Sequence, residues 1–200
     1  MPKKFTPNDP YFYKAKKMGF RARSAFKLLE ILQKFPKLLP PKNGKFCDLG
    51  AAPGSFLQVL KTKNPKILVG VDLQKIKKID GAELFVGDIF SDEILKKLAS
   101  RGQFDFLSSD LAPKTTGQKD LDQWHSVELC ERVLAIFPRI LKPGGNAVMK
   151  IFVGADFDDF LKKMKKKFAV VKIFKPKACR DRSFETYLVA RLFSPDGIKK

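Results

Sequence analysis

The sequence predicts an α/β fold in which helices cover both faces of a mainly parallel, seven-stranded sheet. Short apolar runs alternate with amphipathic helical patterns between residues 45 and 193, as expected for strand–helix–strand units. A glycine-containing turn joins the first apolar run to the helical pattern behind it, and an aspartate follows three of the runs. Because no repeat or low-complexity linker divides its 200 residues, we expect one domain, 1–200, with a basic N-terminal arm at 1–23.

The elements follow one another along the chain with clear boundaries. Apolar residues at i, i+3, i+4 and i+7 from Leu28 to Phe35 predict an amphipathic helix at 24–35, with Ser24 as its N-cap and Pro36 beyond its end. No helix separates the last two apolar runs, so the final strand can be antiparallel. Strands are expected at 45–49, 67–71, 84–87, 104–109, 146–152, 168–174 and 186–193, and further helices at 54–62, 91–100, 121–141 and 155–166.

The positive charge is concentrated at the two ends of the chain. Of the formal net charge of +19, residues 1–45 hold 12 Lys/Arg and 2 Asp/Glu, residues 46–160 hold 15 and 16, and residues 161–200 hold 13 and 3. If these flanks meet in space they form a basic face, the electrostatic footprint of a polyanion-binding protein. Lysine-rich ends that only aid solubility, or that bind acidic lipid, are the alternatives.

Aromatic residues near Arg21 and Arg23 favour RNA as the polyanion, because forked donors and stacking surfaces are combined there. The candidate RNA contacts are Lys14, Lys17, Arg21, Arg23, Lys175, Arg180 and Arg182.

The remaining composition excludes several classes of protein. Cys47, Cys130 and Cys179 are odd in number, widely spaced and without a Cys-x-x-Cys pair, so neither a disulfide framework nor a metal site is expected. No apolar run reaches the roughly 18 residues that span a bilayer, and the first residues lack the apolar core of a signal peptide. We therefore expect a soluble, cytoplasmic monomer that binds no membrane.

The turn within residues 46–60 predicts a cofactor site. A short strand breaks into Gly50-Ala51-Ala52-Pro53-Gly54, and an amphipathic helix begins directly behind it. The two glycines permit a close approach of the backbone to a ligand, and the helix start offers unpaired N–H groups. The spacing differs from the dinucleotide pattern G-x-G-x-x-G because alanine stands where a pyrophosphate would favour glycine, so a ligand with little phosphate is indicated.

Acidic residues follow the next three strands. Asp72 lies 22 residues after Gly50, where a carboxylate commonly accepts the hydroxyls of a ribose, and Asp88 and Asp110 follow the third and fourth strands. One such aspartate often only caps a turn. Three of them in register with a glycine loop describe a nucleoside site with an acidic rim, which suits a cationic ligand such as S-adenosylmethionine.

Five separated motifs resemble the FtsJ family of ribosomal-RNA 2′-O-methyltransferases. In the family's order they are Arg21–Leu28, Asp48–Gly54, Ser109–Pro113, Val148–Phe152 and Lys175–Tyr187. Phe56 departs from the family pattern, in which tryptophan is common, so an aromatic face remains without the indole N–H donor. The resemblance implies a Rossmann-like class I methyltransferase fold and an S-adenosylmethionine site formed by Gly50, Ala51, Pro53, Gly54, Ser55, Phe56, Asp72, Leu73, Asp88, Ile89 and Asp110.

The resemblance also implies a catalytic tetrad of Lys27, Asp110, Lys150 and Glu185. Lys150 is the most informative of the four, because it interrupts the apolar run 147–153, where an ammonium group is costly without a partner or a task. The alternative is a lysine that extends from the strand end into solvent. As a catalytic group, Lys150 is either the neutral base that removes the hydroxyl proton or a charged group that orients the hydroxyl.

The family resemblance implies methylation of a ribose 2′-hydroxyl in structured RNA, most simply a uridine of large-subunit rRNA, with S-adenosylmethionine as the methyl donor. Three alternatives stay open from the sequence. They are a tRNA 2′-O-methyltransferase of the same family, a non-catalytic ribosome-assembly factor that retains the fold to bind RNA, and a nicotinamide-dependent oxidoreductase. The tetrad argues against the second, and the missing middle glycine argues against the third.

Overall fold

The computed structural model describes residues 9–40, 43–180 and 183–198. The strands are β1 (Lys45–Leu49), β2 (Ile67–Asp72), β3 (Glu83–Val86), β4 (Phe104–Ser109), β5 (Leu141–Phe152), β6 (Phe168–Phe174) and β7 (Glu185–Phe193). The helices are α1 (Pro10–Lys17), α2 (Ser24–Lys34), α3 (Ser55–Lys61), α4 (Asp92–Ala99), α5 (Lys119–Ile140) and α6 (Phe157–Lys167), with a short 3₁₀ helix at Pro36–Leu38.

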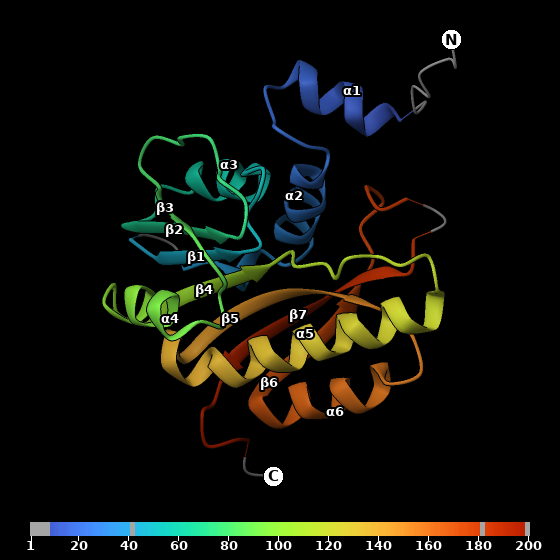
Figure 1. Cartoon of the computed structure of the whole chain (residues 1–200). Helices are drawn as coiled ribbons and strands as arrows, with labels where there is room; N and C mark the ends of the chain where they lie inside the picture. The colour runs from blue at the N-terminus through green and yellow to red at the C-terminus, as the bar shows by residue number, and fades with distance from the viewer. Residues whose placement is uncertain (1–8, 41–42, 181–182, 199–200) are drawn as a thin grey trace.

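The strands form the predicted seven-stranded sheet in the order β3-β2-β1-β4-β5-β7-β6 (Figure 1). Neighbouring strands are parallel except at β7, which runs antiparallel to both β5 and β6. The α/β fold and the antiparallel final strand are therefore confirmed. β5 begins at Leu141, earlier than the expected residue 146, because a register shift opposite Phe104 brings the preceding segment into the ladder with β4.

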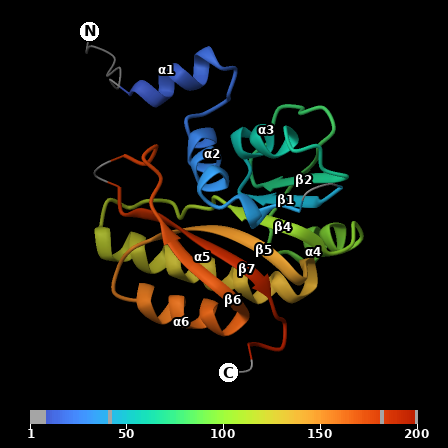
Figure 2. The same ribbon diagram turned by 180° about the vertical axis from the view of Figure 1, so that it is seen from behind.

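Helices cover both faces of the sheet. α2 and α3 pack on one face, and α4, α5 and α6 pack on the other (Figure 1 and Figure 2). Successive residues of the central strands alternate between the two cores, with Phe46 and Phe106 on the α2 side and Cys47 and Leu107 on the α5 side. Both faces of β1 and β4 are therefore buried, which explains why these strands are continuous apolar runs in the sequence.

The N-terminal segment contains a helix where the sequence suggested only a basic arm. Pro10 occupies the first position of α1, and the Asp9 carboxylate caps this helix by accepting a hydrogen bond from the Phe12 N–H. Ser24, expected to be the N-cap of the next helix, is instead the first residue of α2, and its hydroxyl is hydrogen-bonded to that of Ser55 at 2.7 Å. The Ser24 prediction was therefore wrong in detail, because a tertiary contact uses the side chain.

The N-terminal helices are tied to the loop between β6 and β7. The Glu30 carboxylate in α2 accepts hydrogen bonds from the N–H groups of Lys177 and Ala178, at 2.6 and 3.0 Å. Arg23 donates to the Ala178 carbonyl and pairs with Asp9 at the start of α1. Figure 2 shows this loop beside α2. As a result, α2 is fixed to the segment that leads into β7.

The two basic flanks of the sequence meet only in part. The β6–β7 loop lies against α2, but α6 covers the opposite face of the sheet from α1 and α2 (Figure 1). The exposed lysines of α6, among them Lys162, Lys165 and Lys166, therefore point away from the N-terminal helices. The expectation of one basic face formed by both ends of the chain is wrong for α6.

Candidate active site

The four predicted catalytic residues reach one edge of the sheet from four elements. Lys27 belongs to α2, Asp110 follows β4, Lys150 lies near the end of β5, and Glu185 begins β7. Lys150 and Tyr187 are cross-strand partners, and side chains alternate along a strand, so Glu185 and Tyr187 share the sheet face that α2 covers. The structure thus brings together the residues that the family resemblance implied.

The tetrad forms two ion pairs. Lys27 Nζ lies 2.5 Å from Glu185 Oε1, and Lys150 Nζ lies 3.1 Å from Asp110 Oδ1. Lys150 also donates a hydrogen bond to the Asp110 carbonyl at 2.7 Å. At most 18% of any of these four side chains is exposed. Each buried ammonium group is therefore compensated by a carboxylate, and removing one partner would leave an uncompensated charge.

Two further side chains, which were not assigned a role from the sequence, orient these carboxylates. The Tyr187 hydroxyl donates to Asp110 Oδ1 at 2.8 Å, and burial, together with the nearby Asp110 charge, raises the pKa of this phenol well above its ordinary value. The Cys179 thiol donates to Glu185 Oε1 at 3.2 Å, and burial raises its pKa to about 12. Both groups stay protonated at neutral pH and act as donors.

A cavity of about 670 Å³ opens beside the tetrad, at the carboxyl ends of the central strands. The strand order reverses here, between β1 and β4, which is the usual ligand site of an open α/β sheet. Asp110 both lines the cavity and pairs with Lys150, so the cavity and the tetrad are continuous. Seven of the predicted cofactor ligands line it: Gly50, Pro53, Asp72, Leu73, Asp88, Ile89 and Asp110.

The glycine loop and the first acidic residue form one wall of this cavity. Gly50 has a φ of +73°, and a Cβ at this position would lie 2.8 Å from Leu111 Cδ2 and 3.0 Å from the Leu111 nitrogen. The Asp72 carboxylate accepts hydrogen bonds from the N–H groups of Ala52 and Gln74, both at 2.8 Å. A carboxylate has about four acceptor positions, so Asp72 is held in place and can still accept ligand hydroxyls.

Four of the predicted cofactor ligands do not line the cavity. Ala51, Ser55 and Phe56 are at most 3% exposed, and the Phe56 ring faces Tyr187 with 6.5 Å between the ring centroids. Gly54 is buried as well. These residues support the loop from behind, and Phe56 presents no exposed aromatic face to a ligand.

Asp48 is a buried acid directly before the glycine loop. Its Oδ1 accepts a hydrogen bond from the Ser108 hydroxyl at 2.6 Å, and its buried Oδ2 has no hydrogen-bond partner among the described residues. Burial raises the pKa of Asp48 well above its ordinary value, and the charges of Asp110 and Asp72 add to the effect. The sequence marks Asp48 only as part of the loop motif, because its complete burial depends on tertiary packing.

Loops and α5 add cavity residues that were not predicted. The Arg132 guanidinium in α5 lies over the Phe90 ring at 3.9 Å from the ring centroid, and the two side chains form part of the outer wall. Which residues of α5 face the cavity depends on how the helix packs on the sheet. The other unpredicted lining residues are Ala52, Gln74, Lys75, Gly87, Leu111, Ala112, Lys114 and Leu129.

Three of the predicted RNA contacts have partners within the protein, and one of them is Lys175, whose Nζ donates to the Ser183 carbonyl at 2.8 Å. The Arg21 guanidinium donates to three backbone carbonyls, and Arg23 pairs with Asp9 and donates to Ala178. Three hydrogen bonds of the Arg21 guanidinium and two of the Arg23 guanidinium are thus made within the protein, and RNA contact by these two arginines stays a prediction. Arg182 lies outside the described residues. Lys175 is nevertheless exposed, as are the remaining candidates Lys14, Lys17 and Arg180.

Within residues 9–40, 43–180 and 183–198, no group of three or more His, Cys, Asp or Glu side chains is arranged to hold a metal ion. Across the same parts of the chain, no helix combines the length and apolar character needed to cross a membrane.

The family model described as FtsJ-like methyltransferase matches residues 20–193, a span that contains the tetrad and the whole cavity lining. The chain belongs to the FtsJ-like methyltransferase family. Its similarity to curated FtsJ-like relatives covers most of the chain. A protein of Methanothrix thermoacetophila named ribosomal RNA large subunit methyltransferase E is 40% identical over 185 residues, covering 92% of this chain and 72% of the relative. A protein of the same name from Methanoregula boonei is 41% identical over 187 residues, covering 92% and 95%.

Solved structures share the fold of this chain. A ribosomal RNA methyltransferase of Plasmodium falciparum superposes with a TM-score of 0.75 at 28% identity, covering 87% of this chain and 98% of that chain. Human methyltransferase-like protein 13, solved in complex with SAH, has a TM-score of 0.58 at 16% identity and covers 88% and 84%. The second comparison is one of fold alone, and it agrees with the Rossmann-like order of strands in the sheet.

Proposed function

We propose that this FtsJ-like methyltransferase transfers a methyl group from S-adenosylmethionine to a ribose 2′-hydroxyl of RNA, most simply a uridine of large-subunit ribosomal RNA. The observation that carries the proposal is the continuity, through Asp110, of a cofactor-sized cavity with a largely buried Lys-Asp-Lys-Glu tetrad. Relatives named ribosomal RNA large subunit methyltransferase E support ribosomal RNA as the substrate. With such a substrate, a cytoplasmic monomer remains our expectation.

The cavity has the size and the polar groups that S-adenosylmethionine requires. Its volume of about 670 Å³ is within the roughly 300–1,000 Å³ of small-molecule sites. Asp72 would accept the ribose hydroxyls of the cofactor, and Gly50 would let the backbone approach it closely. Three carboxylates and three cations line the cavity, so it offers partners for charges of both signs, and S-adenosylmethionine carries a carboxylate, an ammonium and a sulfonium. They are Asp72, Asp88, Asp110, Lys75, Lys114 and Arg132. Once bound, the cofactor supplies an electrophilic methyl group on a sulfonium.

The tetrad would remove the proton of the RNA hydroxyl and align the ribose for methyl transfer. The ribose 2′-oxygen forms a bond to the methyl carbon as the carbon–sulfur bond breaks, and the hydroxyl proton must leave. We assign this proton to the Lys150 nitrogen, which Asp110 holds through two contacts. To accept it, Lys150 must enter the step as the neutral amine, its ammonium proton having first passed to water. The Lys27–Glu185 pair would orient the ribose, and alignment alone contributes several kcal/mol to such a transfer.

Transfer of tritiated methyl groups from S-adenosylmethionine tests this function. We expect label in large ribosomal subunits or their free rRNA, and none with Asp110→Ala. Label in tRNA alone would instead show that this chain is a tRNA methyltransferase of the same family. Salt-sensitive RNA binding without any S-adenosylmethionine binding by calorimetry would favour a non-catalytic assembly factor.

A further inference from the structure

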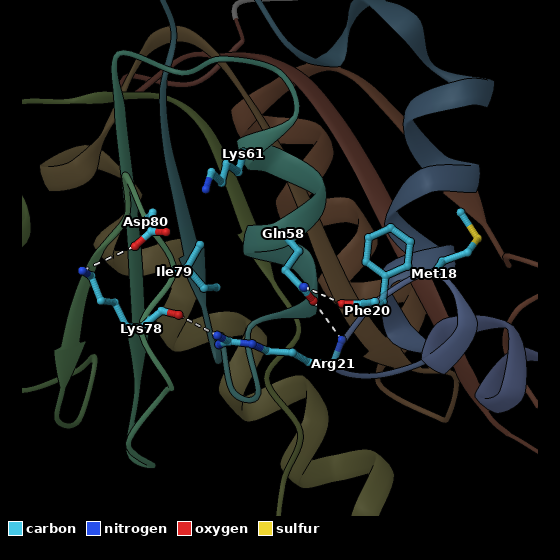
Figure 3. A pocket seen from close by; sticks show the side chains of 9 residues that line it. Met18, Phe20, Arg21, Gln58, Lys61, Lys78, Ile79 and Asp80 are labelled. Carbon is cyan, nitrogen blue, oxygen red and sulfur yellow. Dashed lines mark hydrogen bonds and ion pairs between the residues drawn. The ribbon is translucent and has the colours of Figure 1, made fainter.

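Arg21 lies in a shallow surface pocket of about 350 Å³ between the N-terminal segment, α3 and the β2–β3 loop. Figure 3 shows its side chain extended from the N-terminal segment towards Lys78, with Gln58 of α3 beside it. Nη1 donates to the carbonyls of Pro53 and Lys77 at 2.9 and 2.7 Å, and Nη2 donates to the carbonyl of Lys78 at 2.7 Å. Three of the roughly five N–H donors of the guanidinium are therefore directed at main-chain oxygens.

These carbonyls belong to the two loops that carry the cofactor cavity. Pro53 itself lines the cavity from the glycine loop. Lys77 and Lys78 lie in the β2–β3 loop, which begins with the cavity residues Leu73–Lys75. One planar cation, which is not itself part of the cavity lining, thus joins the two loops, a geometry that a lysine ammonium cannot reproduce.

The main chain at Arg21 is anchored as well. The Arg21 N–H donates to Gln58 Oε1 at 2.8 Å, and Gln58 Nε2 donates to the Gly19 carbonyl at 2.9 Å. Arg21 also lies just ahead of α2, the helix that carries Lys27. The segment therefore connects α3 and both cofactor loops to the tetrad lysine.

The second glycine of the loop, Gly54, lies against the Arg21 guanidinium. A Cβ at Gly54 would lie 2.7 Å from Arg21 Nη1 and 2.8 Å from Ile79 Cδ1, and the Gly54 φ is +107°. Gly54 does not line the cavity. Its positive φ alone favours glycine, and the absence of a Cβ also leaves room for the Arg21 guanidinium.

We propose that Arg21 is a positioning residue that holds the glycine loop and the β2–β3 loop in the geometry that binds S-adenosylmethionine, rather than an RNA ligand. The proposal rests on the proposed function for its cofactor. The Arg21 guanidinium then keeps the two loops in place, and the exposed lysines nearby contact the RNA.

Calorimetric binding of S-adenosylmethionine and salt-dependent RNA binding separate the two roles. We expect Arg21→Ala to weaken S-adenosylmethionine binding about tenfold or more, because the loops that hold the ligand would be displaced. Arg21→Lys should recover only part of the lost affinity. The slope of log affinity for RNA against log salt should be unchanged in both variants, as it should be in the control Arg139→Ala, whose side chain lies in α5 near Asp92. Unchanged cofactor affinity with an RNA slope reduced by about one would overturn the proposal.

Amide hydrogen exchange of the ligand-free protein gives a readout that does not depend on the cofactor's identity. Both Arg21 variants should exchange faster at residues 50–54 and 73–82, with the rest of the sheet still protected. Protection of both loops equal to that of the wild type would overturn the proposal even if the wild-type protein binds S-adenosylmethionine. Failure of the wild-type protein to bind the cofactor, with faster loop exchange in the variants, would count against the proposed function alone.

Discussion

In the proposed function, Lys150 accepts the hydroxyl proton, and it does so from an otherwise apolar strand. Its Nζ contacts both the carboxylate and the carbonyl oxygen of Asp110. Arginine would keep the charge but cannot usefully lose a proton. We expect Lys150→Arg to lower kcat at least about 100-fold, because general-base catalysis contributes roughly 10²- to 10⁴-fold, with little change in S-adenosylmethionine affinity.

Single-turnover methyl transfer at saturating RNA and cofactor measures this effect, and circular dichroism shows whether the variant is folded. Lys142→Arg is a suitable control, because Lys142 is half-exposed and pairs with Asp105, away from the cavity. Near-normal turnover of Lys150→Arg would contradict the base assignment and leave Lys150 as a charged orienting group.

Asp48 should make the stability of the protein depend on pH. Its pKa is raised in the folded state, so the folded protein holds this proton more tightly than the unfolded chain does. The stabilising contribution is complete below the ordinary aspartate pKa of about 3.9 and is lost as the pH rises through the folded-state value. At neutral pH the carboxyl group is therefore a source of instability.

Replacement of Asp48 by asparagine removes this dependence and retains an acceptor for the Ser108 hydroxyl. We expect Asp48→Asn to be more stable than the wild type near pH 8. The difference in the free energy of unfolding should be about 1.4 kcal/mol for each pH unit between the ordinary aspartate pKa and the folded-state pKa, or the pH of the measurement if that is lower. The difference should shrink towards about pH 5. Thermal unfolding over this pH range is the measurement, and a difference that is constant or grows in acid would contradict the interpretation.

The tetrad could be named from the sequence because each member lies in a recognisable motif. Lys150 was also conspicuous by itself, as a charge in an apolar strand. Tyr187 could have been found from the alternation of side chains along β7, since it lies two residues from Glu185 on the same face. Cys179 and the true partners of Arg21 could not, because both depend on loops that come together only in the folded chain.

At the scale of elements, the loop after β1 restricts most strictly which residues can occupy it. Gly50 combines a positive φ with close contacts to Leu111, whereas Gly144, with a φ of +77°, has open space among the described residues where a Cβ would lie. Alanine at either site should cost about 1 kcal/mol or more from backbone strain. Only alanine at Gly50 should also displace the loop from Leu111.

We therefore expect Gly50→Ala to weaken S-adenosylmethionine binding at least about tenfold, and Gly144→Ala to leave it unchanged despite a similar loss of stability. Calorimetry and thermal unfolding of the two variants check this pair of expectations. Equal cofactor affinity in both variants would mean that the Gly50 contact does not shape the cavity.

Most helices and strands could be predicted from the spacing of their apolar residues. This spacing differs between helices and strands, and the two kinds of element alternate along the chain. α1 was missed, because its apolar stripe is short and its stability depends on a cluster with Phe26 and Ala178. The packing of α1 and of the β6–β7 loop on α2 is set by Glu30 and Arg23, whose hydrogen bonds join segments far apart in the chain. Sequence periodicity carries no information on such contacts.

For the molecule as a whole, the placement of positive charge predicts which side meets RNA. α1 packs on α2, on the same side of the sheet as Lys27, whereas α6 covers the opposite face. Neutralising the exposed lysines of α1 should therefore weaken RNA binding and its salt dependence more than neutralising those of α6. Each lost phosphate contact should lower the slope of log affinity against log salt by about 0.7–0.9.

Two matched triple variants test this expectation in one titration series. In each, three exposed lysines are replaced by glutamine, namely Lys14, Lys16 and Lys17 in α1 or Lys162, Lys165 and Lys166 in α6. A larger effect from the α6 variant would show that RNA approaches from the other face.

The position of the transferred methyl group tests the central claim most directly. Large-subunit rRNA incubated with the protein and labelled S-adenosylmethionine is digested to nucleosides, and the label is located by mass spectrometry. The tetrad geometry predicts that the label lies on the ribose 2′-oxygen of one nucleoside and is absent with Asp110→Ala. A labelled base, or labelling that persists without the Asp110 carboxylate, would contradict it.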